Sequence, residues 1–219
     1  GGKIMKGNGV QQMLERLKVV ITESHVVYTS GKHGSAYVNK DAIYPHTTET
    51  SRLCGLIAHM FMSDRVEVVI APAVGGCILS NRVAEHLTMW GKEWGVNEVF
   101  GVYADKDGED FVIKRGYDKL VRGKRVLVVE DVLTTGGSVK KVVKATRIAG
   151  GHVVGVGALC NRGDITSEDV DVPRLEALIN VKLDSWDESN CPLCKGGVPI
   201  NTDVGKGREF LAKKAVTLG

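Results

Sequence analysis

The residues best suited to chemistry stand together in the run VLVVEDVLTTGGSV, from Val126 to Val139. Two carboxylates, Glu130 and Asp131, end an apolar stretch that is typical of a buried strand. Small residues from Thr134 to Ser138 follow and lead into a helical pattern. Glycines and small side chains let several backbone N–H groups point at one anion where a helix begins, so this loop is suited to a phosphate group.

The two acids cannot themselves favour a phosphate, because like charges repel. Their natural partners are hydroxyl donors, such as the two on a ribose ring, or a magnesium ion. A sugar phosphate therefore satisfies both halves of the motif. The alternative is a tight turn capped by Thr135 or Ser138, but the adjoining strand and acids favour the binding loop.

The rest of the chain must supply the elements that position this motif. Val10 to Thr22 has the apolar spacing of an amphipathic helix, and Val26 to Asn39 is predicted to form a short strand pair. Beyond them, strand and helix patterns alternate, which predicts a mostly parallel sheet with helices on both faces. Strands are expected to begin near Val66, Glu98, Arg125 and His152, and helices over residues 47–62, 78–90, 139–149 and 172–179.

These patterns predict an α/β chain with three parts: an N-terminal helix and small hood over residues 1–46, a core over 47–163 and a C-terminal extension over 164–219. Residues 104–124 interrupt the core with a charged, glycine-punctuated segment around the apolar residues 111–113. Such a segment is expected to form a mobile arm or hairpin.

Composition narrows the class of partner. The 219 residues are 43% hydrophobic and carry a net charge of only +3, so one main domain is expected, and no polybasic block marks a nucleic-acid or membrane binder. The longest apolar runs, such as Val66 to Ala73, fall far short of the roughly 20 residues of a membrane span. Five cysteines, an odd number, and no secretory pattern predict a cytoplasmic protein.

The stretch from Val126 to Val139 resembles the phosphoribosyl pyrophosphate (PRPP) motif of type I phosphoribosyltransferases, a hydrophobic strand followed by two acids and a threonine- and glycine-rich loop. The resemblance implies an enzyme whose magnesium ion arrives with PRPP, so no residue is assigned to a metal of its own. Glu130 and Asp131 would hold the ribose hydroxyls. The PRPP-binding set that the motif implies is Glu130, Asp131, Val132, Leu133, Thr134, Thr135, Gly136, Gly137 and Ser138.

Three other segments resemble orotate phosphoribosyltransferases. They are SGKHGSAYVNKDAIYP (residues 30–45), similar to the base-binding segment, APAVGGCIL (71–79), similar to the pyrophosphate loop, and CNRGD (160–164), similar to the turn whose arginine contacts orotate. The resemblance implies orotate and PRPP as substrates and a homodimer with shared active sites. It places pyrophosphate contacts at Val74, Gly75 and Gly76, and base contacts at Lys32, Tyr37, Val38, Thr134 and Arg162.

Displacement of pyrophosphate passes through a cationic sugar, so the enzyme must stabilise the departing charge and exclude water. Besides Asp131, the candidate catalytic residues are the arm cations Lys106, Lys114 and Arg115, which are expected to close over the pyrophosphate as a lid. The alternative is a solvated, charged hairpin. Two other functions stay open. One is transfer to another base, a purine or uracil. The other is a non-catalytic regulator that senses PRPP and binds nucleic acid, and the modest net charge disfavours this second alternative.

The tail contains CPLC, from Cys191 to Cys194, which suggests zinc. A structural zinc site needs four ligands, however, and no second cysteine or histidine pair follows at a suitable spacing. Two such pairs meeting in a dimer, or a reduced structural turn without metal, are the alternatives. None of the six histidines shows ligand spacing, so the sequence predicts no metal site of the chain's own.

Overall fold

A computed structural model describes residues 10–17, 19–28, 30–92, 95, 98–181 and 183–217. The chain divides into two compact units. The first unit combines both ends of the chain, Gly1–Pro45 and Lys182–Gly219, and the second unit is His46–Val181. The predicted C-terminal extension is therefore divided, because residues 164–181 belong to the second unit with the core.

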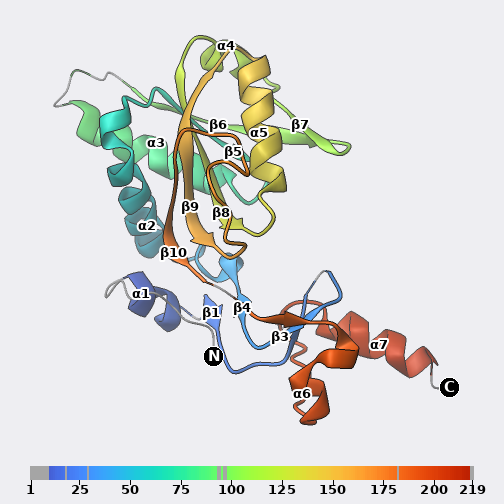
Figure 1. Ribbon diagram of the computed structural model, residues 1–219. Helices are drawn as coiled ribbons and strands as arrows, with labels where there is room; N and C mark the ends of the chain where they lie inside the picture. The colour runs from blue at the N-terminus through green and yellow to red at the C-terminus, as the bar shows by residue number, and fades with distance from the viewer. Residues whose placement is uncertain are drawn as a thin grey trace. The chain divides into compact units, whose positions relative to one another are not determined.

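The second unit is built on a six-stranded sheet in the order β10-β9-β8-β5-β6-β7 (Figure 1). All neighbouring strands are parallel except the hairpin pair β6 and β7. Strand β5 is buried throughout its length, as expected of a β-branched, apolar strand covered on both faces. The bounds are Val68–Pro72 (β5), Phe100–Asp107 (β6), Asp110–Val112 (β7), Arg125–Leu133 (β8), His152–Asn161 (β9) and Leu175–Asn180 (β10).

Helices cover both faces of this sheet, as predicted. Helix α3 joins β5 to β6 and α5 joins β8 to β9, and these two crossovers run in opposite directions along the sheet, so right-handed connections place them on opposite faces. Figure 1 shows α5 on one side and α2 with α3 on the other. The helices are α2 (Thr47–Met60), α3 (Cys77–Gly91), α4 (Tyr117–Val121) and α5 (Gly137–Ile148), with a 3-10 turn at Met62–Asp64.

The predicted helix over residues 172–179 is wrong. Leu175–Asn180 forms β10, which pairs in parallel with β9 from Val156 to Asn161. The segment LEALIN contains good helix formers, but pairing with the sheet satisfies its backbone groups and packs Ile179 into the interior. Tertiary pairing therefore outweighed local propensity.

The first unit consists of short elements from the two chain ends. Strands β1 (Val20–Ile21) and β4 (Tyr37–Val38) form one antiparallel pair, and β3 (His33–Gly34) lies between β2 (Val26–Val27) and β11 (Ser185–Trp186). Its helices are α1 (Val10–Arg16), α6 (Pro192–Lys195) and α7 (Gly207–Thr217), with 3-10 turns at Lys40–Ala42 and Glu188–Asn190.

Helix α1 is shorter than the predicted helix over Val10 to Thr22. It ends at Arg16, and Val20–Ile21 pairs with β4 instead, because a β-branched run suits a strand better than a helix. Backbone hydrogen bonds join the two chain ends: the N–H of Asn201 donates to the carbonyl of His25 at 2.7 Å, and that of Lys206 to Val27 at 2.7 Å. In the described part of the chain, no helix is both long and apolar enough to cross a membrane.

Candidate active site

The strand order places the candidate site at the carboxyl edge of the sheet. From β5 the chain moves to β6 on one side and then returns to β8 on the other, so the order reverses between β5 and β8. Ligands of open α/β sheets bind at such a reversal, beyond the carboxyl ends of the strands. Ile70 of β5 lies beside Val128 of β8, so Pro72 at the end of β5 is level with Glu130, and β8 continues beyond that level to Leu133.

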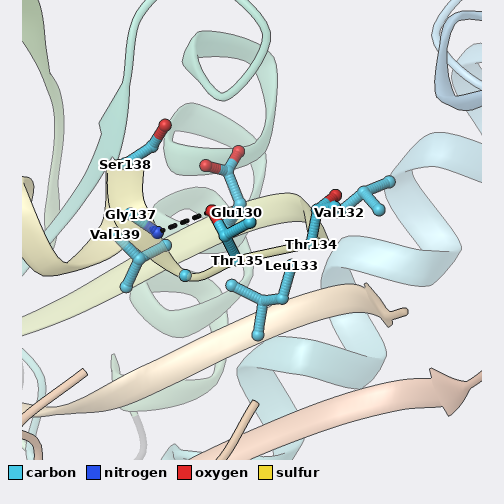
Figure 2. Close-up of a pocket in the computed structure, with 9 residues that line it drawn as sticks. Glu130, Val132, Leu133, Thr134, Thr135, Gly137, Ser138 and Val139 are labelled. Carbon is cyan, nitrogen blue, oxygen red and sulfur yellow. Dashed lines mark hydrogen bonds between the residues drawn. The ribbon is translucent and has the colours of Figure 1, made fainter. Parts of the chain in front are cut away.

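A pocket enclosing about 110 Å³ lies where β8 passes into α5 (Figure 2). Gly136 has a φ of 70°, and a side chain there would meet Val170 at 2.8 Å, so both conformation and space require glycine. The hydroxyl of Thr135 accepts the N–H of Gly137 at 3.4 Å, which closes the turn. The pocket is lined by Glu130, Val132, Leu133, Thr134, Thr135, Gly136, Gly137, Ser138 and Val139.

This geometry fits an anion. The first turn of a helix leaves backbone N–H groups without helical partners, and here that turn opens at the pocket with Gly137, Ser138 and Val139. Val139 is a lining residue that the sequence analysis did not include; its apolar, buried side chain marked it only as part of the helix face. The predicted phosphate loop is thus a formed pocket rather than only a capped turn.

The two acids differ in their surroundings. Glu130 is 9% exposed and lines the pocket, whereas Asp131 is 2% exposed and does not. Alternate side chains of a strand point to opposite faces, which separates the two carboxylates. Each accepts a backbone N–H of the next residue: Oε1 of Glu130 that of Asp131 at 3.0 Å, and Oδ1 of Asp131 that of Val132 at 2.7 Å.

Arg162 follows β9 and lies beside the pocket loop. Its guanidinium donates to the hydroxyl of Thr134 at 3.4 Å, so two of the predicted base-binding residues lie together. The backbone N–H groups of Arg162 and Gly163 both donate to the carbonyl of Leu133, at 2.8 and 3.1 Å. The turn is therefore fastened to the end of β8.

Gly163 makes this approach possible, because a Cβ at that position would lie 1.8 Å from the carbonyl oxygen of Thr134. We expect Gly163→Ala to push the two loops apart and lower the melting temperature by about 2–12 °C, the range for roughly 1–3 kcal/mol of overpacking in a chain of this size. Differential scanning fluorimetry measures this. The control is Gly123→Ala, where φ is 72° but nothing lies within 4 Å. An equal or smaller loss at position 163 would contradict the steric argument.

The predicted pyrophosphate loop, Val74 to Gly76, joins β5 to α3. A Cβ on Gly76 would lie 2.5 Å from that of Ala71 and 2.9 Å from the carbonyl oxygen of Pro72, so glycine is needed for the tight turn. Val74 is 85% exposed. An exposed apolar side chain offers no charge to pyrophosphate, so any contact here must come from backbone N–H groups.

The predicted arm contains the β6–β7 hairpin, in which Lys106 lies opposite Phe111. Two of its cations pair within the arm: Arg115 with Asp105 at 3.2 Å, and Lys114 with Asp107 at 3.8 Å. Lys106 is exposed and has no ion-pair partner among the residues that the structure describes. The hairpin is observed, and its movement stays a prediction.

The other predicted base-binding residues belong to the first unit. Lys32 immediately precedes β3 and pairs with Asp187 at 3.5 Å, with both side chains exposed. Tyr37 and Val38 form β4, where Tyr37 is half-buried and Val38 is buried. Their contact with a base stays a prediction.

No thiol of the second unit is activated for nucleophilic attack. Burial, with the Asp105 carboxylate as a second cause, raises the pKa of the Cys77 thiol at the start of α3. Burial also raises the pKa of Cys160 in β9 to about 12. The thiolate is the nucleophilic form of cysteine, so burial disfavours nucleophilic attack by both side chains. The site is therefore suited to holding charged groups of a ligand, not to covalent catalysis through cysteine.

Comparison with known proteins agrees with this geometry. Residues 40–187 match the phosphoribosyl transferase domain family. An orotate phosphoribosyltransferase of Caldanaerobacter subterraneus subsp. tengcongensis is 36% identical over 196 residues, 90% of this chain and 96% of the relative. That of Pelotomaculum thermopropionicum is 39% identical over 175 residues, 80% and 85% of the two chains. The Mycobacterium tuberculosis orotate phosphoribosyltransferase, solved in complex with PRPP, has a TM-score of 0.54 at 19% identity, over 80% of this chain and 91% of that chain.

Proposed function

This chain belongs to the phosphoribosyl transferase family, with orotate phosphoribosyltransferases as its relatives over most of its length, and we propose that it joins orotate to the ribose of PRPP. A bond forms between a ring nitrogen of orotate and the anomeric carbon, and the bond from that carbon to the pyrophosphate oxygen breaks. The products are orotidine 5′-phosphate and pyrophosphate. The family match and the curated relatives confirm the family and the transferase class that the sequence predicted.

The pocket between β8 and α5 is the observation that carries the proposal. We assign the 5-phosphate of PRPP to the N–H groups and hydroxyls of residues 134–138, because a helix start favours an anion. Glu130 and Asp131 are assigned to the ribose hydroxyls, which can donate to a carboxylate. The loop from Val74 to Gly76 follows β5, the neighbour of β8 in the sheet, and is assigned to the pyrophosphate.

The donor set at the pocket also fits a magnesium ion that arrives with PRPP. Glu130 lines the pocket and offers the carboxylate oxygens that magnesium prefers. When bound, the ion neutralises part of the charge of the departing pyrophosphate. Glu130 would hold it, and the remaining ligands would be water and substrate oxygens.

The base is assigned to Arg162 and Thr134, with Lys32, Tyr37 and Val38 as further candidates. The guanidinium of Arg162 lies at the pocket loop, and its planar donors match a carboxylate such as that of orotate. This chemistry favours an anionic base over a neutral one. The proposal also includes a homodimer and a cytoplasmic location. All five cysteines are free of disulfides, in keeping with a reducing compartment.

The direct test is a pyrophosphate-release assay with PRPP, magnesium and one base at a time. Orotate should be the preferred substrate, and uracil, which lacks the carboxylate, should react poorly because the arginine would be left unpaired. Xanthine, hypoxanthine and adenine complete the panel. A preference for a purine or for uracil would reject the orotate assignment, and no turnover with any base would reject the enzymatic one.

The arm offers a separate prediction. Lys106→Ala should lower kcat at least about tenfold, because this exposed cation has no competing partner in the described structure and is available to the pyrophosphate. Lys114→Ala and Arg115→Ala should have smaller effects, since both side chains already pair with acids of the arm. None of the three should shift the melting temperature by more than about 2 °C, because exposed charges contribute little to stability.

The matched control is Lys119→Ala, an exposed lysine of α4. Initial rates with saturating orotate and PRPP, together with thermal unfolding, distinguish the outcomes. If all three arm variants turn over at the parental rate, the lid hypothesis is wrong.

A further inference from the structure

The first unit contains a cluster of four metal-binding side chains that the sequence analysis did not recognise. We call the set His25, His33, Cys191 and Cys194 the Cys2His2 cluster; the ligand atoms of its four members all lie within 4.8 Å of one another. All four residues belong to the same compact unit. The two histidines come from the N-terminal segment and the two cysteines from the CPLC turn.

We propose that this unit binds one structural zinc ion per chain. The ligand atoms are Nε2 of His25, Nδ1 of His33 and the two Sγ atoms of Cys191 and Cys194. Two cysteines and two histidines form a complete tetrahedral set for zinc, with no position left open for a substrate. The ion is therefore structural and separate from the oxygen-ligated magnesium proposed for PRPP.

The distances suit this geometry. Zinc–nitrogen bonds of about 2.0 Å and zinc–sulfur bonds of about 2.3 Å place tetrahedral nitrogen and sulfur ligands roughly 3.5 Å apart. Sγ of Cys194 lies 3.3 Å from Nδ1 of His33 and 3.6 Å from Nε2 of His25, and Sγ of Cys191 lies 3.7 Å from the same Nε2. The two nitrogens are closer, at 2.8 Å, and need to separate slightly to admit the ion.

Burial also favours a bound cation. His33 and Cys191 are fully buried, His25 is 2% exposed and Cys194 is half-buried, so three of the four polar groups lie where water has little access. Without an ion the cluster contains one short contact, between the two imidazoles, and weak contacts to sulfur. Two thiolates would neutralise the charge of a zinc ion, and buried charges are tolerated when they are paired in this way.

The surrounding hydrogen bonds hold the ligands in position. Nδ1 of His25 lies 2.7 Å from the carbonyl oxygen of Val198, and donating to it leaves the lone pair of Nε2 directed at the cluster. The CPLC turn is closed by backbone bonds from Lys195 to Cys191 at 3.2 Å and from Val198 to Leu193 at 2.9 Å. Such outer contacts accompany most histidine metal ligands.

The first unit is built from short elements that a metal cross-link would stabilise. Its strands are two residues long, and its two chain segments are separated by the whole second unit. A small unit with a limited apolar core gains stability from a metal or another cross-link. The zinc ion joins residues that are 166 and 169 positions apart, from His25 to Cys191 and to Cys194.

The experiment measures metal content in the full chain, purified under reducing conditions without chelator and desalted. Inductively coupled plasma mass spectrometry should find one zinc per chain. Removal with a strong chelator should lower the melting temperature by more than about 5 °C, and added zinc should restore it. Replacement with cobalt should give the visible spectrum of a tetrahedral site with thiolate ligands.

Cys191→Ser and Cys194→Ser should retain less than about half of the parental zinc content after desalting, because each removes one of four ligands, whereas Cys77→Ser and His152→Gln, a thiol and an exposed histidine of the other unit, should retain the full content. Cys194→His is a second test that does not depend on the folding of the serine variants. It keeps four ligands, so it should still bind cobalt tetrahedrally, with a weaker thiolate band.

Three results would overturn the proposal: a folded, reduced chain that takes up no zinc at micromolar concentration, full zinc content in the two serine variants, or a Cys191–Cys194 disulfide in the freshly purified protein. None of these measurements uses orotate or PRPP, so the test is independent of the proposed enzymatic function.

Discussion

Glu130→Gln should lower kcat/KM for PRPP by roughly 10- to 150-fold, the equivalent of the 1.5–3 kcal/mol of a charge-assisted hydrogen bond. The carboxylate lines the pocket at the end of β8, where it is assigned to a ribose hydroxyl. Glutamine keeps the shape and one oxygen, which can still accept the N–H of Asp131, but it removes the charge. The fold should therefore persist while substrate binding weakens.

Initial rates at varied PRPP, measured beside thermal unfolding, give the result. Asp131→Asn is the companion variant and should lose at least about tenfold in activity, since a charged acceptor is again replaced by a neutral one. An unchanged rate in a well-folded Glu130→Gln protein would contradict the ribose-binding role. Loss with Asp131→Asn alone would move that role to the acid that lies outside the pocket lining.

Arg162→Ala should weaken the use of orotate by roughly 10- to 150-fold in kcat/KM, with a smaller change in the KM for PRPP. Its guanidinium is held at the pocket loop by contact with Thr134, and an anionic base needs a cationic partner. Arg162→Lys keeps the charge but loses the planar fork, so it should recover only part of the activity.

Titration of each substrate against the parent and both variants separates binding of the base from binding of PRPP. Equal losses for the two substrates would indicate a PRPP role or a disturbed loop. Full activity in Arg162→Ala would remove this residue from the base site.

Much of the fold could be predicted because its signals are periodic and local. The buried strands at Val68–Pro72 and Arg125–Leu133 are continuous apolar runs, and the helices between strands show apolar faces. One exception shows where local propensity misleads. Leu175–Asn180 was predicted as a helix because its residues favour one, and only pairing with β9 made it a strand.

The sequence by itself determined the family and marked the loop to which PRPP is assigned, because an anion cradle is built from consecutive backbone groups between one strand and one helix. The tertiary structure decided which acid lines the pocket, and which of the three candidate arm cations has no ion-pair partner within the described part of the chain. It alone brought His25 to Cys191, 166 positions away, and His33 to Cys194, 161 positions away. Such a ligand set has no spacing to recognise, since its members meet only when the two ends of the chain pack into one unit.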